Sequence, residues 1–176
     1  MSRAYLNDRW CVRCGRTGPT PYLRDKWDRL IAHNLINKAA MDVGCGNGRN
    51  SAFVESKGLE CVRVDAAPGC DGKLVTCVLG KESIPIKDKR KIALILCNYV
   101  LMFLSKTERA RLALDILRLA IKGAIVVLEM YAAKDSECKT DAECEKVLDE
   151  FVSLLGKTRD AHTLHQVKLR RIIRLN

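Results

Sequence analysis

The sequence predicts an α/β fold in which helices cover both faces of a mostly parallel sheet. Three observations support this prediction. Apolar residues at 39–43 lead into a glycine-rich turn and then into residues 51–57, which can form a helix. A second apolar run, 92–97, has the length and unbroken hydrophobicity of a central strand covered on both faces. Predicted strands alternate with predicted helices along the chain, as is typical of a parallel sheet.

The glycine-rich turn is the most informative stretch of the sequence. It reads Asp42-x-Gly44-x-Gly46-x-Gly48, and Arg49 takes the place of the third glycine of the G-x-G-x-x-G dinucleotide pattern. Glycine tolerates positive φ and has no Cβ, so backbone N–H groups in such a turn can approach a ligand closely. The pattern therefore predicts a ligand at the end of the first strand.

This segment resembles motif I of the class I S-adenosylmethionine-dependent methyltransferases, in which an acidic residue at the end of the first strand precedes the same glycine spacing. The resemblance implies a Rossmann-like fold, S-adenosylmethionine as cofactor, and methyl transfer by in-line displacement. It assigns the methionine part of the cofactor to Gly44, Cys45, Gly46 and Gly48, and its ammonium group to Asp42, directly or through water. An oxidoreductase that binds NAD at this turn is a further enzymatic alternative.

Three further positions are expected to contact the cofactor. Asp65 closes the next predicted strand, 61–64, where a carboxylate can accept hydrogen bonds from both ribose hydroxyls. Gly80 follows the third predicted strand, 74–79, where members of the family meet the adenine base, so its contact would be through the backbone. Cys97 ends the fourth predicted strand and is the third of these positions.

The acceptor is expected to bind where the fourth strand ends. Asn98 and Tyr99 follow that strand and could hydrogen-bond to a planar substrate or stack on it. Residues 98–104 are similar to the segment after strand 4 in small methyltransferases of the tellurite-resistance type, which favours a small-molecule acceptor. Neither the proline that follows the nucleophile of cytosine-C5 enzymes nor the double proline of adenine-N6 enzymes is present. Because the donor is activated by its positive charge, alignment can supply much of the acceleration, and a general base is optional.

The chain is expected to depart from the family between its second and fourth strands. Residues 66–73 are too few for a helix-containing parallel crossover. Residues 82–91 are charged and contain Pro85, which indicates a loop. We therefore expect helices B and C of the family fold to be shortened or absent.

Capping patterns and periodicity predict the remaining helices. Thr20 and Pro21 open a helix with apolar residues at helical spacing as far as Leu35, and its aromatic residues are candidates for a rim over the site. Capping boxes begin two longer helices, which are expected to end at glycines. These pairs are Ser105 with Glu108, before Gly123, and Thr140 with Glu143, before Gly156.

Two strands are predicted near the C-terminus. Residues 124–130 form an apolar strand, and residues 167–175 alternate as one strand with a basic outer face, with room for a short partner strand at 162–165. The 176 residues fit one domain, with a basic N-terminal segment and helix at 1–37 and a cofactor-binding core with a basic C-terminal strand at 38–176.

The net charge of +10 is concentrated at the two ends of the chain. Residues 1–40 hold eight Lys or Arg residues and three Asp or Glu residues, and residues 157–176 hold six and one. This asymmetry suits an anionic partner such as nucleic acid. The alternative function is therefore a basic nucleic-acid-binding protein with a non-catalytic methyltransferase-like fold. A solvated surface rich in lysine and arginine would also explain the charge.

The cysteines and the hydropathy give weaker indications. Cys11 and Cys14 form a C-x-x-C-G sequence, half of a zinc knuckle, and are candidates for zinc ligands or a disulfide; reduced thiols are the ordinary alternative. The sequence does not indicate any other metal site. Apolar runs are too short to span a membrane, and the N-terminus lacks the apolar region of a signal peptide, so we expect a cytoplasmic protein.

Overall fold

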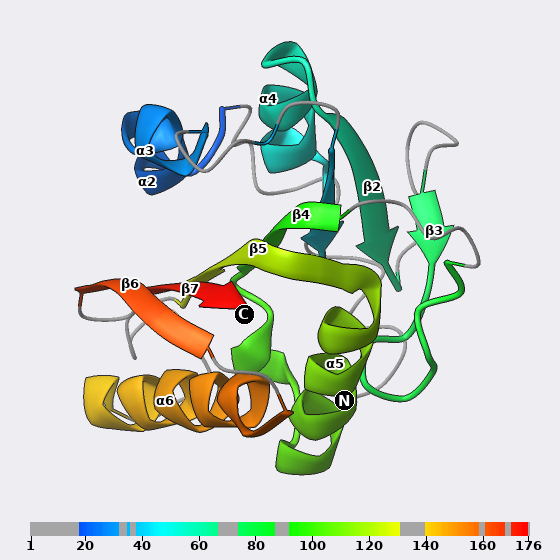
Figure 1. The fold of residues 1–176 in the computed structure, drawn as a ribbon. Coiled ribbons are helices and arrows are strands. Elements are labelled where there is room, and N and C mark those ends of the chain that lie inside the picture. The colour runs from blue at the N-terminus through cyan, green and yellow to red at the C-terminus, as the bar shows by residue number, and fades with distance from the viewer. Residues whose placement is uncertain are drawn as a thin grey trace.

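The computed structural model describes residues 18–31, 35, 38–66, 74–86, 92–130, 140–158, 161–167 and 170–175. They form a seven-stranded sheet between two layers of helices (Figure 1). The strand order is β3-β2-β1-β4-β5-β7-β6. Strands β1 to β5 are parallel, and β7 runs antiparallel to both β5 and β6. The predicted fold class is confirmed.

The bounds of the elements are as follows. The strands are β1 (Ala39–Val43), β2 (Glu60–Asp65), β3 (Leu74–Thr76), β4 (Ile92–Asn98), β5 (Ala120–Glu129), β6 (Ala161–Val167) and β7 (Arg170–Leu175). The helices are α2 (Pro21–Asp25), α3 (Trp27–Ile31), α4 (Arg49–Ser56), α5 (Lys106–Leu119) and α6 (Asp141–Thr158), with a 3-10 turn, η1, at Leu101–Phe103.

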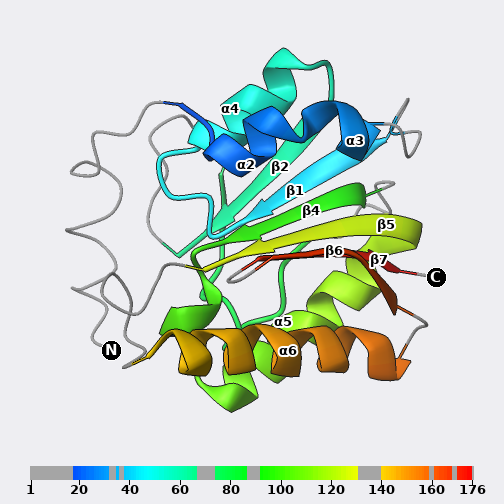
Figure 2. The same cartoon turned by 90° about the vertical axis from the view of Figure 1, so that its left-hand side faces the viewer.

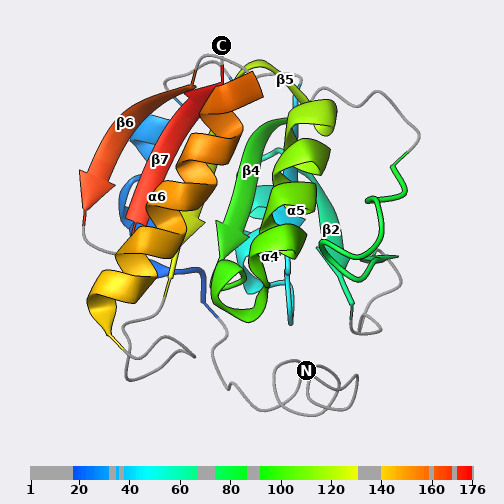
Figure 3. The same cartoon turned by 90° about the horizontal axis from the view of Figure 1, so that it is seen from below.

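Each face of the sheet has its own helical layer. Helices α2, α3 and α4 cover one face, and α5 and α6 cover the other (Figures 2 and 3). Because side chains alternate along a strand, Ile95 and Val126 belong to the core under α5 and α6, whereas Leu94 and Ile125 belong to the core under α2 to α4. Every residue of β4 is buried, as predicted for a central strand.

The chain reverses its direction of winding between β1 and β4. From β1 it passes through α4 to β2 and β3 on one side, and it then returns to β4 and continues through α5 to β5 on the other side. Helices α4 and α5 lie on opposite faces (Figure 2). In open parallel sheets the crevice outside the carboxyl ends of the strands at this point is the usual ligand site. The fold therefore favours a ligand site at the carboxyl ends of β1 and β4.

No helix lies between β2 and β4 in the described residues, which are 66 and 74–86. The expected loss of helices B and C is confirmed for this part of the chain. The predicted strand at 74–79 was too long, because after Thr76 the chain leaves the sheet and turns through Gly80, which has a φ of 75°. Asp115 and Arg118 of α5 bind both backbone groups of Ile84 in this connection.

The predicted N-terminal helix is divided into α2 and α3. Lys26, between them, has a φ of −110° and a ψ of 8°. The two parts pack on different partners, because the Tyr22 ring lies 5.0 Å from the guanidinium carbon of Arg170 and the Trp27 ring packs edge-on against Phe53 of α4 at 5.4 Å. The prediction of one continuous helix was therefore wrong.

The expected ends of the two longer helices were also wrong. Helix α5 ends at Leu119, because Ala120 is extended and pairs with Ile92 in the sheet. Gly123 lies inside β5 with a φ of 80°, where the register with β4 is irregular. Helix α6 continues past Gly156 to Thr158. The predicted N-terminal caps were correct, since Ser105 and Glu108 form a complete capping box and Thr140 Oγ1 accepts from the Glu143 N–H.

The C-terminal residues form a hairpin of β6 and β7, so the predicted partner strand exists. The basic outer face predicted for this segment was wrong for Arg170, which donates to the buried Glu129 and lies under Tyr22. Arg171, on the other face of the strand, is buried and paired with Asp149 at 2.7 Å. Helices cover both faces of β7, which an alternating pattern in the sequence does not reveal.

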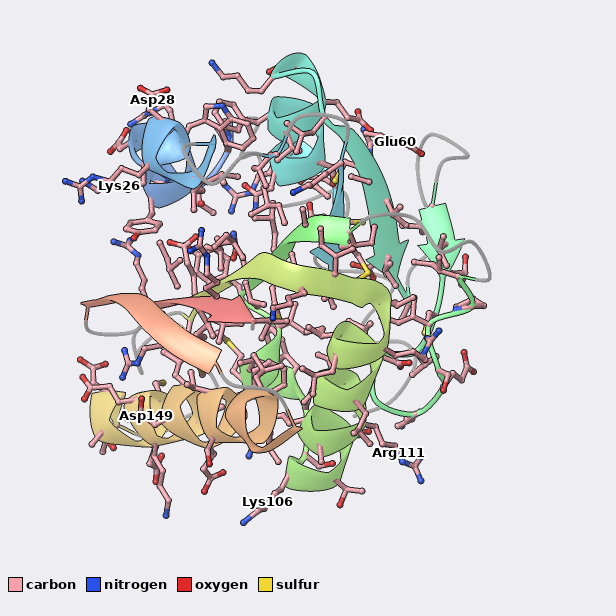
Figure 4. The ribbon with its side chains drawn as sticks, in the orientation of Figure 1. Lys26, Asp28, Glu60, Lys106, Arg111 and Asp149 are labelled. Atoms are coloured by element: carbon pink, nitrogen blue, oxygen red, sulfur yellow. The ribbon has the colours of Figure 1, made fainter. Side chains whose placement is uncertain are left out.

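Charged side chains mark the outer surface of the helices. Lys106 and Arg111 of α5 point away from the sheet (Figure 4). Asp149 of α6 is exposed and pairs with Arg171 of β7. None of the helices in the described ranges has both the length and the apolar character needed to cross a bilayer.

Candidate functional site

The glycine turn links β1 to α4 in the conformation that the sequence predicts. Gly44, Gly46 and Gly48 have φ values of 68°, 54° and 73°. Residues with a Cβ avoid this left-handed region, so the three glycines allow a turn that other residues would strain. The N–H groups of Gly44 and Cys45 donate to the Val64 carbonyl, which ties the turn to β2.

The three glycines of the turn differ in what a Cβ atom at each position would meet. A Cβ on Gly44 would collide with the side chain of Val100, so the turn after β1 touches the segment after β4. A Cβ on Gly48 would lie 3.2 Å from the Arg63 guanidinium. In contrast, a Cβ on Gly46 would have no neighbour within 4 Å among the described residues. The middle glycine therefore borders open space.

Asp65 is brought to the same turn. Its Oδ2 atom accepts a hydrogen bond of 2.8 Å from the Gly46 N–H, and its side chain is only half-buried. The acid at the end of β2 and the middle glycine of the turn thus form one unit at the mouth of the crevice. The sequence predicted that these residues serve one ligand, and the structure brings them into contact.

Asp42 lies beneath the turn rather than at its mouth. Its Oδ2 atom accepts a hydrogen bond of 2.6 Å from the Ser51 hydroxyl of α4, and the residue is buried. Burial is the main cause that raises the pKa of Asp42 to about 6; the charge of Asp65 adds to this, while Ser51 and Arg63 oppose it. The carboxylate therefore retains a proton more readily than an ordinary aspartate does.

Asn98 and Tyr99 lie at and just after the end of β4, which pairs with β1. Asn98 is 6% exposed, and neither its Nδ2 nor its Oδ1 atom has a hydrogen-bond partner within the described part of the chain. Tyr99 has a φ of 63°, a conformation that other non-glycine residues of the described ranges do not adopt, and its N–H donates to the Glu129 carbonyl at 2.8 Å. Buried polar atoms without partners and backbone strain are both concentrated at functional sites.

Glu129, at the end of β5, was missed by the sequence analysis. It is 1% exposed; Oε1 accepts from Arg170 Nε at 2.9 Å, and Oε2 has no partner among the described residues. Burial raises the pKa of Glu129, against the effects of the Thr20 hydroxyl and of the charges of Arg170 and Arg49. An acid that closes an otherwise apolar run, 124–128, was the available signal.

Two further residues predicted to contact the cofactor, Gly80 and Cys97, have close neighbours within the protein. Gly80 packs against the start of α5, where a Cβ would lie 2.5 Å from the Glu108 carbonyl oxygen, so in the described structure its small size serves this packing. Cys97 is fully buried in the core under α5 and α6, which leaves only its backbone near the crevice. Burial raises the thiol pKa of both Cys97 and Cys45 far above the usual value, so neither is prepared to act as a thiolate.

The segment that precedes α2 is fixed against the start of α4. Arg49 donates to the Gly18 carbonyl at 3.0 Å, and the Thr20 N–H donates to Asn50 Oδ1 at 2.9 Å. Of the aromatic rim candidates, Tyr22 lies over Arg170, which binds Glu129, whereas Trp27 is a core residue.

The metal candidates Cys11 and Cys14 lie outside the described residues. Within the described ranges, no group of three or more His, Cys, Asp or Glu side chains could hold a metal ion.

A family model for a methyltransferase domain matches residues 41–128, which is half of the chain. The chain belongs to the S-adenosylmethionine-dependent methyltransferases. It is therefore a transferase with S-adenosylmethionine as its cofactor, and not an NAD-dependent oxidoreductase. The sequence matches none of the curated proteins with which it was compared.

Several solved structures have the same fold as the methyltransferase, although their sequences are only distantly similar to it. A methyltransferase from Archaeoglobus fulgidus is 14% identical, with a TM-score of 0.53 over 73% of this chain and 66% of that chain. A TehB-like enzyme from Corynebacterium glutamicum is 15% identical, with a TM-score of 0.55 over 87% and 95%. The 1,6-didemethyltoxoflavin-N1-methyltransferase of Burkholderia thailandensis is 16% identical, with a TM-score of 0.54 over 88% and 76%. At such identities the likeness shows the fold alone.

The residues at the crevice of the methyltransferase fit the cofactor. The turn offers open space above Gly46, and Asp65 provides a carboxylate beside it. The cofactor supplies a methyl group that is already activated by the positive charge on sulfur, so the protein must chiefly hold and align the two reactants.

Proposed function

We propose that the methyltransferase transfers a methyl group to a small molecule bound at the carboxyl ends of β4 and β5. The observation that supports this most directly is the pair of unpartnered polar atoms of buried Asn98, at the end of the strand that pairs with β1. Two structural neighbours are named for small-molecule acceptors, 1,6-didemethyltoxoflavin and magnesium protoporphyrin IX.

On this proposal each part of the cofactor has its own residues. The turn of Gly44, Cys45, Gly46 and Gly48 holds the methionine part, and Asp65 binds the ribose while it keeps the turn in place. Asp42 attracts the ammonium group from below the turn. Gly80 contributes backbone near the base, and Cys97 contributes backbone at the end of β4. Asn98 and Tyr99 face the acceptor.

Calorimetry and radiolabelled methyl transfer test this function. We expect S-adenosylmethionine and S-adenosylhomocysteine to bind, and labelled methyl to pass to a small molecule from a panel that also contains RNA, DNA, protein, thiols and metalloid oxyanions. Absence of heat with both nucleosides would contradict the assignment of the site. Labelling of RNA or DNA alone would contradict the proposed acceptor class.

The raised pKa of Asp42 predicts that binding of the cofactor depends on pH. The ammonium group of the cofactor favours the ionised carboxylate, and below about pH 6 a proton must first leave Asp42. We expect the Kd for S-adenosylmethionine to fall about tenfold between pH 5 and pH 7. Calorimetry at these pH values measures this change.

Two controls isolate the effect of Asp42. 5′-Methylthioadenosine lacks the ammonium group, so its Kd should be the same at both pH values. The Asp42→Asn variant should bind S-adenosylmethionine with equal affinity at pH 5 and pH 7. A pH dependence that persists in this variant would assign the titration to another group.

Nucleic acid is the less supported acceptor. Arg170 and Arg171 account for part of the basic C-terminal charge, and both form ion pairs inside the molecule. We expect binding of a short RNA only in the non-specific range, with Kd about 10⁻⁴ to 10⁻⁶ M at physiological salt and a steep loss as salt rises. Tight binding that persists in high salt would instead favour a nucleic-acid substrate.

A further inference from the structure

Asn98 and Glu129 lie side by side at one end of the sheet. They are directly opposite each other in the parallel pairing of β4 with β5. Neighbouring strands are about 4.8 Å apart, and side chains at paired positions point to the same face. This is the face covered by α2 to α4, since Leu96 and Val127, two residues earlier in each strand, belong to that core.

The pair contains three buried polar atoms without a hydrogen-bond partner in the described part of the chain. They are Nδ2 and Oδ1 of Asn98 and Oε2 of Glu129. Burial of such atoms costs about 1–3 kcal/mol each relative to a state in which they are hydrogen-bonded. The preceding residues of both strands, 94–97 and 125–128, are apolar. These unpartnered atoms therefore do not contribute to the stability of the sheet.

Neighbouring groups hold the Glu129 carboxylate in a fixed orientation. Arg170 binds Oε1, and the Tyr22 ring lies over the guanidinium of Arg170. The Tyr99 N–H donates to the Glu129 carbonyl, and this hydrogen bond fixes the backbone of Glu129. One carboxylate oxygen is thus used for positioning. The Thr20 hydroxyl is near enough to lower the pKa of Glu129, but no described residue makes a hydrogen bond of ordinary geometry to Oε2.

We infer that Asn98 and Glu129 form the floor of the acceptor subsite and that this subsite takes an acceptor with N–H donors, such as an amine, rather than an anion. The inference rests on the proposed function and specifies its substrate class. Oδ1 and Oε2 accept from N–H groups, while Nδ2 donates to a neighbouring oxygen of the same acceptor. A metalloid oxyanion or a thiolate would instead face the unpartnered carboxylate oxygen, which repels negative charge.

Sinefungin allows a test that needs no identified acceptor. In this analogue of S-adenosylhomocysteine an amine-bearing carbon replaces the sulfur, so an ammonium group stands where the transferred methyl would point. We expect wild-type protein to bind sinefungin more tightly than S-adenosylhomocysteine. The quantity to measure by calorimetry is the Kd for S-adenosylhomocysteine divided by the Kd for sinefungin, which is large when sinefungin is preferred.

Three variants assign the preference for sinefungin to the pair. Glu129→Gln removes the charge but keeps the shape, and it should reduce the ratio about tenfold, as expected for loss of a charge-assisted hydrogen bond. Asn98→Ala should reduce it about threefold and should fold, because it removes only unpartnered polar atoms. Asp149→Asn changes a carboxylate on the opposite face of the sheet (Figure 4), where it pairs with the adjacent Arg171, and should leave the ratio unchanged.

The outcomes separate this inference from the proposed function. If wild-type protein binds neither nucleoside, the proposed function fails. If both bind but Glu129→Gln and Asn98→Ala leave the ratio within twofold of wild type, the acceptor subsite lies elsewhere and the inference is wrong. Thermal unfolding of each variant identifies loss of folding, and Asn98→Ala alone decides the question if Glu129→Gln does not fold.

Discussion

Replacement of Gly46 by valine is expected to weaken the binding of S-adenosylmethionine by about 100-fold or more. The reason is steric, because the position of its Cβ is open in the described structure and is the space assigned to the cofactor. Close approach of a ligand to the backbone requires a residue without a side chain. A displaced nucleoside would lose several hydrogen bonds to the turn at once, and each 1.4 kcal/mol lost corresponds to about tenfold in Kd.

Gly58→Val is the matched control for this prediction. Gly58 also has a positive φ, 86°, and a Cβ there also meets nothing within 4 Å, but it follows α4 and does not face the crevice. Both variants should lose about 2 kcal/mol of unfolding free energy from backbone strain. Only Gly46→Val should lose the cofactor in calorimetry. Equal affinities in the two variants would show that the cofactor does not lie over the turn.

The conformation of the glycine turn was predictable because its signals are local. Three glycines at fixed spacing require positive φ wherever the chain folds, and an acid that closes the next strand must reach the same edge of a parallel sheet. The hydrogen bond from Gly46 to Asp65 shows that the turn and this acid do meet. The shortened connection between β2 and β4 was also predictable, since the number of residues limits what it can contain.

The proposed acceptor side was only partly predictable. Asn98 and Tyr99 were found from their position after an apolar strand, but Glu129 gains its significance from the register of β4 with β5 and from Arg170, 41 residues later in the chain. Arg170 itself was assigned to an outer face, because alternation shows that two faces differ but not what covers them. The partners of Glu129 and Arg170 are therefore set by contacts between residues far apart in the sequence, which local patterns do not reveal.

Residues 77–86, in the connection between β3 and β4, form no helix, so contacts with other elements must hold them against the core. Asp115 of α5 is buried and accepts from the Ile84 N–H at 3.1 Å and from Arg118 at 2.7 Å, while Arg118 donates to the Ile84 carbonyl at 2.8 Å. Two side chains thus bind both backbone groups of a buried loop residue. In this way α5 replaces hydrogen bonds that a helix in the connection would make within itself.

Asp115→Ala is accordingly expected to lower the unfolding free energy by about 3 kcal/mol, because it leaves the buried Ile84 N–H without its acceptor and breaks the pair with Arg118. Asp25→Ala makes the same chemical change in an exposed pair with Arg24, whose N–O distance is 2.9 Å, and should cost about 0.5 kcal/mol or less. Urea unfolding of the two variants measures both values. Equal losses would show that the loop is held by its apolar contacts; a large loss for Asp115→Ala alone would show that the polar attachment to α5 stabilises this edge of the fold.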